Sequence, residues 1–156
     1  MKHSVMRRLH FPAIAVGVMV ASALTTAQRN PYRNYTVDKF VLSMQTAGRN
    51  FGAVNDLLAK NDFETAKAQL TRAREQLAIT VQFWRDKQKD DAVKMLRDTL
   101  TKMDALDAEL SREKVDAATV SAAARQVNAA CQTCHAGYRD QDPATKAYRL
   151  KPGSVQ

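Results

Sequence analysis

Between Tyr35 and Asp142 the chain contains no proline and few glycines. The same stretch is rich in alanine, leucine, lysine, glutamine and glutamate, which are all good helix formers. Its apolar residues recur at spacings of three and four, and no run shows the sustained alternation that is typical of a strand. The sequence therefore predicts an all-α fold.

The apolar pattern divides into four blocks, and each block follows a residue that can cap a helix. Thr36 precedes the first block, Asp62 the second, Asp90 or Asp91 the third, and Asp116 the fourth. Four helices of about 20–25 residues with short connections predict an antiparallel, up-down-up-down four-helix bundle. The expected core seams are Phe40, Met44, Ala47, Phe51, Val54 and Leu58; Phe63, Ala66, Leu70, Ala73, Leu77, Val81 and Trp84; Val93, Leu96, Leu100, Met103 and Leu110, with Leu106 beside the seam; and Val120, Ala123, Val127, Ala130, Cys131, Cys134 and Tyr138.

The fourth block ends in a C-x-x-C-H run, Cys131-Gln132-Thr133-Cys134-His135, which is the pattern of covalent c-type haem attachment. In a helix these two cysteines and the histidine project from one side, because they are three and four residues apart. The thiols form thioethers with the haem vinyl groups, and the imidazole binds the iron. The motif therefore predicts one covalently bound haem c on the C-terminal helix, with Cys131 and Cys134 as attachment points and His135 as an iron ligand.

Three other uses of paired cysteines fit the sequence less well. A two-thiol redox motif normally lies at a strand-to-helix turn, and the pattern shows no strand here. A structural zinc site needs about four nitrogen or sulfur ligands, whereas the chain beyond residue 27 has two cysteines and one histidine. A disulfide remains an alternative, but it explains neither His135 nor its position.

The first 27 residues have the pattern of a secretory signal peptide, with a basic start, an apolar stretch from Phe11 to Leu24, and small residues at 25–27. The apolar stretch is short for a membrane-spanning helix, which needs about 20 apolar residues, although an uncleaved anchor is the alternative. Haem c is attached outside the bacterial cytoplasm, in a compartment that tolerates oxidising chemistry. We therefore expect a periplasmic protein with no membrane span after cleavage.

Cleavage is expected to leave one bundle domain, residues 28–142, followed by a polar tail, residues 143–156. The whole chain has a formal net charge of +8, and the basic excess is spread along it. Such an excess suits redox partners with acidic docking surfaces. A nucleic-acid partner is not expected, because the chain has no basic cluster and no aromatic-basic motif.

At this point the chain resembles the class II c-type cytochromes, which comprise the cytochrome c-prime group and its low-spin relatives. Residues 131–139 look like the family pattern C-x-x-C-H-x-x-Y-R, and residues 43–52 look like the family's first helix. The resemblance covers most of residues 36–139. It implies haem c in a four-helix bundle, His135 as the proximal ligand, Arg139 in the haem environment, and often a homodimer. The connection between the second and third helices is shorter here than is typical of c-prime proteins.

The sixth iron ligand distinguishes the branches of this family, and the position that matches it here is Met44. A protein ligand there would normally be His or Met, and beyond residue 27 the only methionines are Met44, Met95 and Met103. Gly48, one turn along from Met44, would admit the edge of a macrocycle. A methionine on a core seam is also a common core filler without any ligand role.

Two functions therefore remain open from the sequence. With His135 and Met44 both bound, the iron is closed to small gases, and the protein is expected to carry single electrons between redox partners. With His135 as the sole protein ligand, the iron would bind NO or CO, as in a gas-binding or sensing protein. An enzyme is not expected, because nucleophilic catalysis of the Ser-His or Cys-His type needs a free histidine.

Overall fold

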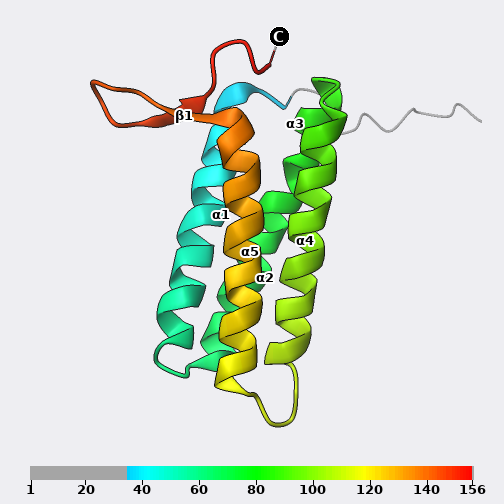
Figure 1. Ribbon diagram of the computed structural model, residues 1–156, viewed down its shortest axis with the longest axis vertical. Coiled ribbons are helices and arrows are strands. Elements are labelled where there is room, and N and C mark those ends of the chain that lie inside the picture. The colour runs from blue at the N-terminus through cyan, green and yellow to red at the C-terminus, as the bar shows by residue number, and fades with distance from the viewer. Residues whose placement is uncertain (1–34, 156) are drawn as a thin grey trace, which may run out of the picture. The chain divides into compact units, whose positions relative to one another are not determined.

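The computed structural model describes residues 35–155, and the signal peptide expected at residues 1–27 lies outside this range. The described part is mostly helical, which confirms the predicted all-α fold (Figure 1). No helix within it is long and apolar enough to cross a membrane. The elements in chain order are α1 (Val37–Leu58), α2 (Phe63–Ile79), α3 (Val81–Asp86), α4 (Asp90–Leu110), α5 (Ala117–Tyr138), β1 (Arg139–Gln141) and β2 (Tyr148–Leu150).

Three of the predicted helix caps are confirmed by their hydrogen bonds. The side chains of Thr36, Asp62 and Asp116 each accept a bond from the backbone N–H three residues further on, at the starts of α1, α2 and α5. The prediction for α4 is wrong, because Lys89 is its cap residue and makes no side-chain capping bond. Asp90 and Asp91 lie instead in the first turn of α4, where their negative charges favour the helix dipole.

The apolar pattern predicts one helix from residue 63 through Trp84, whereas the structure divides this stretch at Thr80. Thr80 is fully buried, and its hydroxyl donates a 2.6 Å bond to the carbonyl of Leu77. A threonine hydroxyl that bonds a nearby carbonyl competes with the helical hydrogen bonds of the backbone, which explains the interruption. α3 then ends before Gln88, whose φ of 53° lies in the left-handed region.

The four long helices lie side by side (Figure 1), with contacts between α1 and α2, α2 and α4, α4 and α5, and α5 and α1. Most of the predicted seam residues form one buried cluster, as the helical period requires. Some positions differ from the prediction, and the seam residues that are only partly buried are Met44, Phe63, Val81, Leu100, Ala123, Ala130, Cys131 and Tyr138. Leu106, placed beside the seam, is fully buried, and Ala124 is buried in place of its neighbour Ala123.

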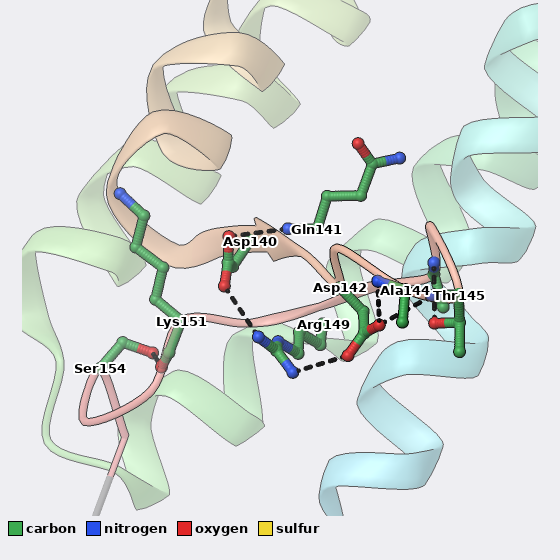
Figure 2. Close-up of polar contacts among 9 residues, drawn as sticks. Asp140, Gln141, Asp142, Ala144, Thr145, Arg149, Lys151 and Ser154 are labelled. Atoms are coloured by element: carbon green, nitrogen blue, oxygen red, sulfur yellow. Dashed lines mark hydrogen bonds and ion pairs between the residues drawn. The ribbon is translucent and has the colours of Figure 1, made fainter.

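The chain ends in a β-hairpin, which the sequence pattern does not predict. β1 pairs with β2 in antiparallel register, with Arg139 opposite Leu150. Figure 2 shows the polar contacts that hold it: Arg149 forms ion pairs with Asp140 and Asp142 at 3.3 and 2.9 Å. The backbone N–H of Lys151 bonds the carbonyl of Tyr138, so the hairpin is fixed to the end of α5.

Candidate cofactor-binding site

A cavity of about 480 Å³ lies against the C-terminal part of α5. Its volume is within the range of roughly 300–1,000 Å³ that is typical of ligand pockets. α1 forms one wall and α5 another, and further lining residues come from α2, α3, α4 and the hairpin. The cavity therefore depends on side chains that are far apart in the sequence.

The C-x-x-C-H motif faces this cavity, because Cys131, Cys134 and His135 all line it from α5. The cysteines are not bonded to each other; Cys131 is half-buried and Cys134 is buried. Burial raises the pKa of both thiols, that of Cys134 to about 11. Reactive and redox-active cysteines have a lowered pKa, so this pair lacks the electrostatics of a dithiol redox centre.

His135 is partly buried in the cavity wall, and its imidazole is uncharged. Burial, together with the positive charge of Arg139, lowers the pKa of the imidazole to about 4, so the ring is neutral at pH 7. A neutral imidazole has a nitrogen lone pair available for iron. Its Nδ1 atom is buried and has no hydrogen-bond partner in the described part of the chain.

The facing wall is formed by α1, and Met44 lines the cavity from there. Gly48 and Gly52 lie one and two turns further along the same wall, and a Cβ atom at either would meet nothing within 4 Å. These glycines therefore leave open space between α1 and α5. Of the other methionine candidates, Met103 lines the cavity and is buried, whereas Met95 is not among the lining residues.

The charged residues of the lining are all basic. They are Arg49, Arg139 and Arg149, and no aspartate or glutamate accompanies them. Arg149 is neutralised by its two carboxylate partners, whereas Arg49 and Arg139 form no ion pair among residues 35–155. The guanidinium of Arg139 lies 4.2 Å from the ring centre of Tyr148, in a cation–π contact. The lining therefore favours an occupant with negative charge.

Tyr138 and Trp84 close the cavity beside the motif, with ring centres 4.6 Å apart. The hydroxyl of Tyr138 lies 2.7 and 2.6 Å from the carboxylate oxygens of Asp91 and donates to that carboxylate. This bond fastens the end of α5 to the start of α4. Burial, with the Asp91 bond, raises the pKa of Tyr138 to about 12, and the same bond lowers the pKa of Asp91.

Several lining residues have no counterpart among the predicted site residues. Arg49 and Gly52 belong to α1, and Tyr148, Arg149 and Leu150 belong to the hairpin. One signal for the hairpin was available, since Tyr148-Arg149-Leu150 alternates apolar and polar residues between two prolines. The predicted residues Cys131, Cys134, His135, Met44 and Arg139 all line the same cavity.

These residues fit a haem group. Two thiols and a neutral imidazole lie on one wall, a thioether lies on the facing wall, and two glycines leave space between them. No group of three or more His, Cys, Asp or Glu side chains gathers as a metal site in the described residues. Haem iron does not need one, because the macrocycle supplies four nitrogen ligands and the protein adds only axial ones.

A scan against protein-family models and searches of curated proteins and of solved structures find no match for the chain. A function for this molecule must therefore be inferred from its own residues. The residues that carry most weight are the motif on α5 and the side chains that face it across the cavity.

Proposed function

We propose that this chain is a monohaem c-type cytochrome that carries single electrons between redox partners, related to the low-spin members of the cytochrome c-prime group. Cys131 and Cys134 would hold the haem, and His135 and Met44 would bind its iron. The observation that carries this proposal is that all four side chains line one cavity, although Met44 is on α1 and the others are on α5.

The proposal includes the arrangement of the helices as an antiparallel, up-down-up-down bundle. The connections at residues 59–62, 87–89 and 111–116 are short, and helices that follow each other through short connections pack antiparallel. The contacts of α5 with both α4 and α1 are those of a closed bundle. In this fold the haem lies between the first and last helices.

A bound haem c would supply the one-electron couple of its iron. The chain's own residues bind it, orient it and tune it. His135 is neutral at pH 7 and needs to lose no proton to act as a ligand. Met44, which lines the cavity from α1, would be the second protein ligand of the iron and would close it to gases. Met/His ligation raises the reduction potential. Phe40, Leu77 and Val127 keep the lining largely apolar and exclude water.

The proposed place of action is the periplasm, reached through the signal peptide at residues 1–27. Partners would dock through acidic surfaces, because Arg49 and Arg139 line the cavity without ion-pair partners in the described chain. Opposite charges at such a surface speed the encounter of the two proteins and make its rate depend on ionic strength.

The visible spectrum of the purified protein tests the function. We expect a low-spin spectrum in both oxidation states, with the weak long-wavelength band of sulfur bound to ferric iron. Met44→Ala should abolish that band and convert the iron to high spin. Met103→Leu is the matched control, because Met103 lines the same cavity and should leave the band unchanged. An unchanged protein that is already high-spin and binds CO readily would favour the gas-binding function instead.

A further inference from the structure

Trp84 presents a hydrogen-bond donor that nothing in the described chain accepts. Its side chain is 1% exposed, and its Nε1 atom is buried without a partner. Buried donors without an acceptor are rare in folded proteins, because each keeps the desolvation penalty of a hydrogen bond that is not made. The unpartnered indole N–H of Trp84 is therefore a candidate for a hydrogen bond to a bound ligand.

The surroundings of Trp84 offer no acceptor of their own. Three aromatic rings surround the indole, those of Phe40, Phe83 and Tyr138, with ring centres 5.0, 5.1 and 4.6 Å away. The phenylalanines have no polar atom. The hydroxyl of Tyr138 donates to the carboxylate of Asp91, and it accepts no hydrogen bond from the indole. Trp84 also lines the cavity.

The cavity also indicates what kind of acceptor it would hold. Its charged lining consists of three arginines, of which Arg49 and Arg139 have no carboxylate partner among residues 35–155. Such a lining favours an anionic oxygen. In a haem c the pyrrole nitrogens bind the iron and the two vinyl groups are used by the cysteines, so the propionate carboxylates are the acceptors that remain.

We propose that the indole N–H of Trp84 donates a hydrogen bond to a carboxylate of the cavity's occupant, which under the proposed function is a haem propionate. This assignment rests on the proposed function and adds to it a residue that would bind a propionate. The bond satisfies the buried donor and holds one propionate as an ion inside the aromatic cluster. Trp84 would therefore hold the haem through a contact that is separate from the two thioethers.

The chain has a single tryptophan, which allows a direct test in the haem-loaded protein. ¹⁵N-labelled protein in its reduced state should show one indole N–H signal, with nuclear Overhauser contacts to the propionate methylene protons. The signal should also move with pH along a single titration, that of the bound carboxylate. The proposal is overturned if the indole N–H shows no contact with the propionate methylene protons, or if its signal does not follow the propionate titration. A water molecule between the indole and the propionate would give this negative result.

A variant gives an independent readout. Trp84→Phe keeps an aromatic ring but removes the donor, so the pKa of the propionate, measured from the pH dependence of the reduction potential, should rise by about one unit. Phe83→Leu is the control, because it alters the same cluster without removing a donor, and the propionate pKa should not change. An equal propionate pKa in Trp84→Phe and in the unchanged protein would contradict the proposal. If the variant does not fold, the ¹⁵N spectrum of the unchanged protein decides the case.

The two proposals can fail separately. A purified protein without any haem would contradict the proposed function itself. A protein that carries covalent haem, but whose indole N–H makes no propionate contact, would contradict only the role of Trp84.

Discussion

The two ends of the helical unit are built from the same apolar period but differ in how completely they are filled. The loop end, next to the connections at residues 59–62 and 111–116, lies at the lower edge of Figure 1. Its buried residues are aliphatic, and none of them lines the cavity: Leu58, Ala66, Leu106, Leu110 and Val120. The cavity end, next to the hairpin, contains the aromatic cluster, the motif on α5 and the open space.

This difference shows which end of the helical unit is packed and hydrogen-bonded less favourably. The loop end satisfies both packing and hydrogen bonding, as an ordinary protein interior does. Within residues 35–155, the buried side-chain nitrogens without a hydrogen-bond partner are Trp84 Nε1 and His135 Nδ1, and both residues line the cavity. Unpartnered polar groups that gather around one cavity are typical of a functional site. A bound group that contacts the cavity end would offset them.

The largest expected effect is at the loop end. Leu106→Ala should lower the free energy of unfolding by about 2–5 kcal/mol, because Leu106 is fully buried and its removal leaves a new void. Leu42→Ala is the matched control, since Leu42 is 60% exposed and should change stability by less than about 0.5 kcal/mol. Urea unfolding measures both. A loss below about 1 kcal/mol for Leu106→Ala would mean that the loop end is not closely packed.

A smaller effect on stability, at the cavity end, should have opposite signs in the haem-free and the haem-loaded protein. In the haem-free chain, Gly52→Ala should raise stability by about 0.5–1 kcal/mol, because alanine favours helix and its Cβ meets nothing within 4 Å. In the haem-loaded protein the same methyl group projects into the occupied cavity, and stability should fall. Gly137→Ala is the control, as Gly137 is helical but is not among the lining residues. Thermal unfolding of both forms measures the effect. A gain in stability for Gly52→Ala in both forms would argue against an occupant beside α1.

An effect of similar size concerns the bond that joins α5 to α4. Tyr138→Phe should lower the free energy of unfolding by about 0.5–1 kcal/mol at pH 7, because it removes one hydrogen bond to an exposed carboxylate. The pKa of Asp91 is lowered in the folded protein, so this contribution is present above the unfolded value of about 4 and is lost as pH falls through the folded value.

The pKa of Tyr138 is raised to about 12, so on the basic side the same contribution is present below the unfolded value of about 10 and is lost as pH rises towards 12. Urea unfolding of Tyr138→Phe and of the unchanged protein at several pH values checks this window. The two stabilities should differ at neutral pH and converge in strong acid. A difference that persists in strong acid would assign the effect to the packing of the ring instead of to the bond.

Local signals in the sequence predict much of the fold. The capping residues Thr36, Asp62 and Asp116 and the helical seams act over a few residues, and the structure confirms them. The break at Thr80 depends on a hydroxyl that competes for one carbonyl, which a count of apolar positions does not register. The hairpin depends on contacts of residues 148–151 with residues 138–142, and its two short strands carry little pattern of their own.

For the site, the sequence identifies the residue types that the chemistry needs but not the shape around them. The C-x-x-C-H run and the position of Met44 predict the two walls of the cavity, and the structure places their side chains on that cavity. The unpartnered N–H of Trp84 and the basic lining emerge only when α1, α3, α5 and the hairpin come together. Such features are properties of the packing and are not encoded in any single segment.

The measurement that tests the central claim most directly is the fate of the haem when the purified protein is denatured. Thioether bonds survive denaturation and extraction with acidified organic solvent, whereas haem held only through its iron is removed. We predict that haem absorbance stays with the unchanged chain after extraction and is absent from a Cys131→Ala, Cys134→Ala double variant. A protein exported in a host able to attach haem c, yet without absorbance on the extracted chain, would contradict the account.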